Sequence, residues 1–117
     1  MFLGLRTVIH PAPDLGASKA FFERLLGFAP YFDQPFYVGF GVHGYELGLD
    51  PNADPDVGPV AYWGVDDADA ALATLVAAGA TEAMAVQDVG EGIRVARVVV
   101  PGSGVLGIIE NPHFAAE

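Results

Sequence analysis

Residue types that could perform chemistry are few in this chain and stand far apart. The three histidines, His10, His43 and His113, form neither an H-x-H nor an H-E-x-x-H pair, the spacings that bring metal ligands together on one strand or helix. The sequence has no cysteine, which excludes a thiolate ligand, a thiol nucleophile and a disulfide. Ser103 lies in the turn sequence PGSG with no histidine or acid beside it, so we do not expect a nucleophilic hydrolase.

Glu46 is the strongest candidate for a chemical role. It lies in YELGLD (45–50), which has the composition of a strand, and strand alternation places Glu46 and Gly48 on one face. The apolar alternate residues Leu47 and Leu49, with Tyr45, point the other way and should pack under a helix. Glu46 should therefore line a cleft, where desolvation would favour proton transfer and make it a catalytic candidate. The alternative is a carboxylate satisfied by a neighbour or exposed to solvent; the candidate neighbours are Thr7, Arg94 and Arg97.

The elements that must position these residues repeat along the chain. Residues 14–27 (DLGASKAFFERLLG) and 67–79 (DADAALATLVAAG) share an acidic start, apolar helical spacing and a final glycine. Strand-like runs precede both, at 5–10 and 60–65. We expect Asp14, and Asp66 or Asp67, to cap the two helices, and Gly27 and Gly79 to end them.

Three strands should follow each helix. In the first half these are an edge strand or loop near 29–35 and a hairpin of 37–42 and 45–50 that turns at His43-Gly44. In the second half they are a short strand and turn within 81–89, then a hairpin of 92–100 and 105–110 around 101–104. Residues 51–59 join the halves. The pattern predicts an α+β domain in which a curved sheet is covered by helices on one face.

Composition excludes several function classes. The chain has 117 residues and a net charge of −10, so it should repel nucleic-acid phosphates and anionic membranes. No apolar stretch is long enough to cross a bilayer, and the N-terminal residues do not resemble a signal peptide. We expect a cytoplasmic protein that takes a small-molecule ligand as its partner, with no nucleic acid and no membrane.

The repeated stretches resemble a known superfamily. LRTVIHPAPDLGASKAFFERLLGF, VAYWGVDDADAALATLVAAGA and VVVPGSGVLGIIE are similar to the vicinal oxygen chelate superfamily, which includes glyoxalases, bleomycin resistance proteins and extradiol dioxygenases. The resemblance implies two βαβββ modules that form an open, barrel-like sheet with a central cleft, usually in a homodimer. It predicts that the chain is a single domain, 1–117, made of two modules at 1–52 and 58–112.

The same resemblance places four metal-ligand positions. They lie on the first and last strands of each half and fall on Thr7, Glu46, Val60 and Gly107. Only Glu46 is a good ligand, whereas a specific site needs three or four N, O or S donors. His10 lies three residues after Thr7 and hence on the opposite strand face. We therefore expect no metal and no other cofactor.

Strand alternation also predicts the wall of the cleft. The predicted ligand-binding residues are Thr7, Ile9, Glu46, Gly48, Val60, Tyr62, Gly107 and Ile109. Their glycines and apolar side chains are typical of a small-molecule pocket. In the alternative, the cleft is filled by the chain's own aromatic side chains, for which Phe36, Tyr37, Phe40 and Trp63 are available.

Three functions follow from these observations. We favour small-molecule binding without metal. The second is an enzyme that uses Glu46, metal-dependent only if the register differs, of the glyoxalase-lyase or dioxygenase-like type. The third is a non-catalytic structural or regulatory dimer.

Overall fold

The computed structural model describes residues 1–114, which contain eight strands and two helices. The chain divides into two compact units. The first unit is Thr7–Val60. The second unit combines Met1–Arg6 with residues 61–114. Strand β1 (Leu5–Pro11) therefore begins in the second unit and continues into the first.

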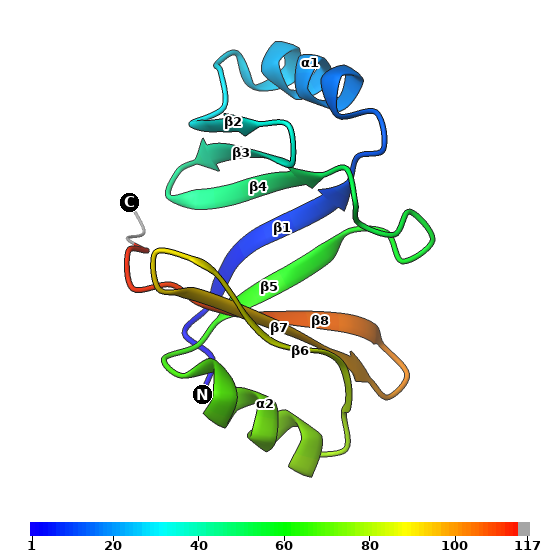
Figure 1. Cartoon of the computed structure of the whole chain (residues 1–117), viewed down its shortest axis with the longest axis vertical. Helices are drawn as coiled ribbons and strands as arrows, with labels where there is room; N and C mark the ends of the chain where they lie inside the picture. The colour runs from blue at the N-terminus through cyan, green and yellow to red at the C-terminus, as the bar shows by residue number, and fades with distance from the viewer. Residues whose placement is uncertain (115–117) are drawn as a thin grey trace. The chain divides into compact units, whose positions relative to one another are not determined.

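The first unit consists of β1, α1 (Leu15–Leu26), β2 (Phe32–Gln34), β3 (Tyr37–Val42) and β4 (Tyr45–Asp50) (Figure 1). The strands lie in the order β2-β3-β4-β1, and only the β4–β1 pair is parallel. Helix α1 begins where the Asp14 carboxylate accepts a hydrogen bond from the Ala17 amide (3.1 Å) and ends at the left-handed Gly27. The β3–β4 turn uses two residues of positive φ, His43 and Gly44. The boundaries of β1, α1, β3 and β4 match the sequence prediction to within one residue, whereas β2 is shorter than the predicted segment 29–35.

The core of the first unit lies between α1 and one face of its strands. Its buried residues are Ala12, Val38, Phe40 and Leu49, and Leu15, Phe22, Leu26, Val42 and Leu47 pack against them. His10 belongs to this side, because its ring lies 6.0 Å from that of Phe22. The predicted packing of Leu47 and Leu49 under the helix is thus confirmed. The face that carries Glu46 is turned away from α1.

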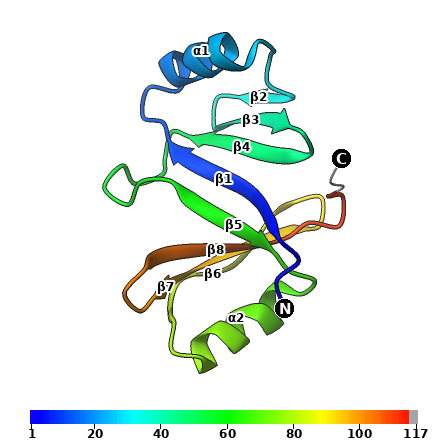
Figure 2. The same ribbon diagram turned by 180° about the vertical axis from the view of Figure 1, so that it is seen from behind.

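The second unit repeats this plan with β5 (Val60–Gly64), α2 (Ala68–Ala77), β6 (Thr81–Gly90), β7 (Ile93–Val100) and β8 (Gly104–Glu110) (Figure 2). The strand order is β5-β8-β7-β6, with β5 and β8 parallel. Asp67 caps α2 by accepting from the Ala70 amide at 3.2 Å. The core on the α2 side joins Val65, Ala68 and Ala71 to Ala96 and Ile108.

The strand–helix–three-strand order of each half and the α+β class are confirmed. One prediction was wrong: residues 81–89 are not a short strand and a turn but belong to the ten-residue strand β6. Two features explain why the sequence pattern does not reveal this strand. Most of its side chains are exposed, and its pairing with β7 contains three register shifts, so no clean apolar alternation develops. Within residues 1–114, no helix has the length and apolar character needed to cross a membrane.

Candidate functional site

Glu46 is held by three hydroxyl groups of the first unit. Its Oε1 atom accepts hydrogen bonds from Thr7 Oγ1 at 2.9 Å and from Tyr37 Oη at 2.7 Å. Its Oε2 atom accepts a hydrogen bond from the hydroxyl of Tyr31, in the segment before β2. Thr7 lies opposite Glu46 in the parallel β1–β4 pair and is only 5% exposed, whereas Tyr31 is 67% exposed. The carboxylate therefore has a buried side, at Oε1, and an open side, at Oε2.

Glycines provide the space in which these side chains meet. A Cβ atom at Gly48 would lie 1.9 Å from Tyr37 Oη, so the tyrosine crosses β4 directly over that residue. A Cβ atom at Gly39 would lie 2.7 Å from Glu46 Oε2 and 3.0 Å from the Tyr31 ring. A larger residue at either position would displace the side chain that lies over it, and with it a hydrogen bond to Glu46.

Both tyrosines remain hydrogen-bond donors at neutral pH. Burial and the Glu46 carboxylate together raise the pKa of Tyr37 well above its ordinary value of 10.0. The pKa of Tyr31 is raised by the same two causes, with burial of the hydroxyl the larger. Within residues 1–114, no basic side chain forms an ion pair with Glu46. The site is thus an anion fixed by neutral donors, with no cationic side chain of the described chain to balance it.

The predicted ligand-binding residues fall into two sets, one in each unit. In the first unit, Thr7 lies opposite Glu46 and Ile9 opposite Gly48. In the second unit, Tyr62 lies opposite Gly107, and Ile109 follows two residues later on the same strand. The remaining predicted residue, Val60, is buried at the start of β5.

The glycines of the predicted wall make room for the chain's own side chains. Gly48 lies under Tyr37, and a Cβ atom at Gly107 would lie 2.5 Å from the Tyr62 ring. At Gly48 the filling residue is Tyr37, which the alternative prediction names, whereas at Gly107 it is Tyr62, which was predicted to bind the ligand. Tyr37 was anticipated only as such a filler, and Tyr31 was missed altogether. A tyrosine in a loop carries no local signal of the carboxylate to which it will bond.

The strand registers show which residues of the two halves occupy equivalent positions, and they change one of the four predicted metal-ligand positions. The Ala12 amide donates to Asp50 O and the Val65 amide to Ile109 O, both at 2.9 Å, which aligns the two halves. On this alignment, Thr7 corresponds to Val60, as the sequence predicts. Glu46, four residues before Asp50, corresponds to Val105, whereas Gly107 corresponds to Gly48.

The residues at these positions do not fit a catalytic metal ion. Glu46 alone offers a strong donor, and both of its oxygens already accept hydrogen bonds from hydroxyl groups. Within residues 1–114, no group of three or more histidine, aspartate or glutamate side chains is arranged to hold a metal ion.

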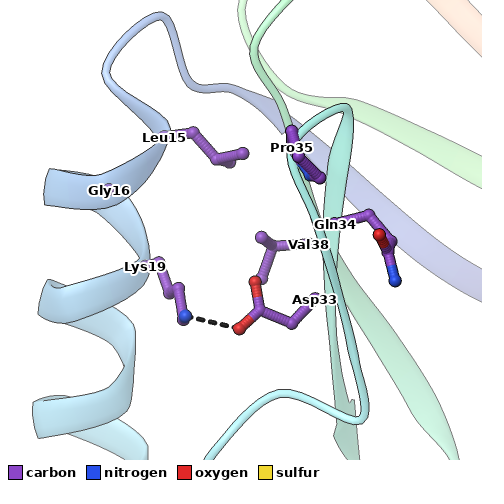
Figure 3. Close-up of a pocket in the computed structure, with 7 residues that line it drawn as sticks. All are labelled: Leu15, Gly16, Lys19, Asp33, Gln34, Pro35 and Val38. Carbon is purple, nitrogen blue, oxygen red and sulfur yellow. Dashed lines mark hydrogen bonds and ion pairs between the residues drawn. The ribbon is translucent and has the colours of Figure 1, made fainter.

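A separate pocket of about 330 Å³ lies on the helix side of the first unit (Figure 3). It is lined by Leu15, Gly16, Lys19, Asp33, Gln34, Pro35 and Val38. Its one charged contact is the ion pair between Lys19 and Asp33. Val38 belongs to the core under α1, so this pocket opens on the face opposite Glu46 and contains no reactive group that is free of a partner.

Comparison with known proteins agrees with this architecture. The family model for the glyoxalase/bleomycin resistance protein/dioxygenase superfamily matches residues 4–106. A search of curated protein sequences finds no significant match.

Solved structures with low sequence identity share the fold. A methylmalonyl-CoA epimerase variant from Streptomyces coelicolor, in complex with 2-nitronate-propionyl-CoA, has a TM-score of 0.77 at 15% identity, covering 96% of this chain and 99% of that one. A superfamily member from Vibrio splendidus 12B01 has a TM-score of 0.67 at 20% identity, covering 91% and 97%. A Mn(II)-bound glyoxalase from Novosphingobium aromaticivorans has a TM-score of 0.68 at 21% identity, covering 99% of this chain and 41% of that one.

Proposed function

The chain belongs to the glyoxalase/bleomycin resistance protein/dioxygenase superfamily, and from that premise we propose that it binds a small organic molecule at Glu46 without a metal ion. The ligand carries a cationic or hydrogen-bond-donating group on an aromatic or apolar body. Fold membership alone does not select a function, because one fold hosts many. The proposal therefore depends on the geometry around Glu46.

The observation that carries the proposal is the asymmetric use of the Glu46 oxygens. An ionised carboxylate has about four acceptor positions. Two are used at Oε1, by Thr7 and Tyr37, but only one at Oε2, by Tyr31. The remaining acceptor position is on the open side, next to Tyr31, a residue that is 67% exposed. A carboxylate beside an accessible aromatic face suits an ammonium or guanidinium group, which is attracted by both.

Binding fits this geometry better than proton abstraction by Glu46. A general base needs an oxygen within hydrogen-bond reach of the substrate proton. Each Glu46 oxygen already accepts at least one hydroxyl hydrogen bond, and Oε1 accepts two. A donor that shares Oε2 with Tyr31 leaves the network intact, whereas removal of a proton from substrate would disturb it.

The test compares charged and neutral probes. Benzylamine and phenethylamine, with benzyl alcohol and phenylethanol as neutral matches, are screened by thermal shift and titrated by calorimetry. The amines should bind and the alcohols should not. Glu46→Gln should weaken amine binding about ten- to a hundredfold, because a hydrogen bond to a charged group contributes about 1.5–3 kcal/mol.

Glu82→Gln is the matched control, since Glu82 is exposed on β6 in the other unit. Its binding should equal that of the wild type. Equal amine affinity in the Glu46→Gln variant would contradict the assigned role of Glu46. If no compound stabilised the wild type, the proposal of a non-catalytic dimer without a ligand would replace this one.

The metal-free part of the proposal has its own test. The protein is purified without an affinity tag or chelator, and its metal content is measured by plasma mass spectrometry. We expect far less than one divalent ion per chain. One tightly held ion per chain, lost in Glu46→Gln, would overturn the proposal and restore a metalloenzyme.

We also propose that the chain forms a homodimer. Phe21 and Leu25 lie four residues apart on α1 and are 51% and 66% exposed, so they form an apolar stripe on the helix. Leu25→Glu should shift the sedimentation coefficient towards that of a monomer. Val76→Glu, which changes an exposed apolar residue of α2, should not. A monomeric wild type would refute this part.

A further inference from the structure

Within residues 1–114, the guanidinium of Arg97 forms no ion pair with an acidic side chain. Arg97 lies on β7, paired with Met84 on β6 and Gly107 on β8, all within the second unit. Its Nη2 atom donates to the Met84 sulfur at 3.2 Å. Its Nε atom is the one buried side-chain nitrogen or oxygen in residues 1–114 that has no hydrogen-bond partner. A thioether is a weak acceptor, so the guanidinium is poorly satisfied.

Arg94 shows what the same strand does when an arginine is structural. Three residues earlier, on the α2 side of the sheet, its guanidinium binds both Asp69 and Glu110. In a chain with 15 acidic and 5 basic residues, acidic partners are abundant. That Arg97 has none within ion-pair distance in residues 1–114 distinguishes it from its neighbour. Each unsatisfied buried polar group of a native protein calls for an explanation, and a bound ion or ligand is one.

An aromatic ring and a glycine lie in register with Arg97 on the same face of the sheet. Strand alternation puts Arg97 on the face opposite Ala96, which packs in the α2 core. On that same face, Tyr62, Gly107 and Arg97 form one row across β5, β8 and β7, and the Tyr62 ring covers Gly107. A guanidinium in register with an aromatic ring is suited to an oxyanion carried on an apolar or aromatic body.

The geometry points to an oxyanion subsite at Arg97, in which the carboxylate or phosphate of a small molecule replaces the Met84 sulfur on the Nε–Nη2 edge of the guanidinium. These two groups donate from one edge of the planar guanidinium and match the two oxygens of a carboxylate. Methionine is flexible and can withdraw at low cost. This subsite lies in the second unit and does not depend on the assignment of Glu46.

The experiment observes the arginine directly. The chain has four arginines, at positions 6, 24, 94 and 97, so their Nε–H signals can be assigned individually by NMR. The ¹⁵N-labelled protein is titrated separately with benzoate, acetate and inorganic phosphate, with chloride as the ionic-strength control. We expect a saturable shift of the Arg97 Nε–H signal and none of Arg94. Tighter binding of benzoate or acetate would assign a carboxylate ligand, and tighter binding of phosphate would assign a phosphorylated one.

Variants separate the subsite from a general salt effect. Arg97→Lys keeps the positive charge but lacks the Nε–Nη2 edge that can donate two hydrogen bonds to one anion. Calorimetry should show an affinity for the anion at least tenfold lower. Met84→Leu removes the competing sulfur at similar volume and should strengthen binding severalfold.

Two results would overturn the proposal. One is an Arg97 signal that moves no more with benzoate or phosphate than with chloride. The other is unchanged anion affinity in Arg97→Lys. Because Arg97→Lys and Met84→Leu are both conservative, and circular dichroism checks their fold, neither result could be attributed to unfolding.

Discussion

Replacing Gly48 by alanine tests whether Tyr37 lies across β4 to reach Glu46. The added Cβ atom would lie 1.9 Å from Tyr37 Oη and 2.7 Å from its ring. The tyrosine must move and lose its 2.7 Å hydrogen bond to the carboxylate. Gly41→Ala is the matched control on β3, because its Cβ atom would meet only the Tyr31 ring, at 3.8 Å.

The expected magnitudes have opposite signs. Alanine in place of a strand glycine is favourable by roughly 0.5–1 kcal/mol, which is the whole effect expected for Gly41→Ala. Gly48→Ala has the same gain but loses a hydrogen bond to a charged group, about 1.5–3 kcal/mol. The net change is a destabilisation of roughly 1–2 kcal/mol. With about 4 °C per kcal/mol for a chain of this size, the two variants should differ in Tm by about 6–12 °C.

Urea unfolding and calorimetry of both variants measure the difference. Adding Gly48→Ala to the Tyr37→Phe variant should lower the free energy of unfolding by less than it does in the wild type, since the hydrogen bond has already been removed. If Gly48→Ala were as stable as Gly41→Ala, Tyr37 would not lie over Gly48, and the assignment of its hydroxyl to Glu46 would be wrong.

Three further predictions concern other parts of the chain. Because the pKa of Tyr37 is raised above 10.0 in the folded state, the unfolded chain binds fewer protons at high pH, so stability should fall between about pH 9 and about pH 11. Urea titrations should show a shallower fall for Tyr37→Phe, and an equal fall would contradict the raised pKa. Asp14→Ala should cost about 1 kcal/mol by loss of the α1 cap, whereas Asp14→Asn should cost only a few tenths, measured by chemical denaturation; equal costs would argue against capping. Gly107→Ala should destabilise by roughly 1–3 kcal/mol, since its Cβ atom would lie 2.5 Å from the Tyr62 ring; wild-type stability would place that ring elsewhere.

The sequence predicted only part of the surroundings of Glu46. Alternation in YELGLD correctly separated Glu46 from the core residues Leu47 and Leu49. Of the candidate partners, Thr7 is confirmed, whereas Arg94 binds Asp69 and Glu110 instead. The two tyrosines that complete the network come from 15 and 9 residues before Glu46 and reach it across strand pairs. Side-chain reach across a sheet leaves no periodic trace in the sequence.

The glycines of the predicted wall also show that the sequence does not reveal which side chains meet. Gly48 and Gly107 suggested an open wall for a ligand, because a residue without a side chain leaves space. Which group fills that space depends on the neighbouring strand. Tyr37 and Tyr62 occupy it in the structure.

By itself, the sequence determined the modules of this protein. Caps at Asp14 and Asp67, the stop at Gly27, the turn at His43-Gly44 and the apolar spacing of strands and helices are local signals, and they act within a few residues of the chain. Tertiary structure alone decided which groups contact Glu46 and Arg97. The parallel register of β1 and β4 places Thr7 against Glu46 across 39 residues of sequence, and the β6–β7–β8 register leaves Arg97 beside a sulfur and not an acid. Those contacts depend on which strands pair and in which register, and long-range pairing is set by the packing of the whole unit.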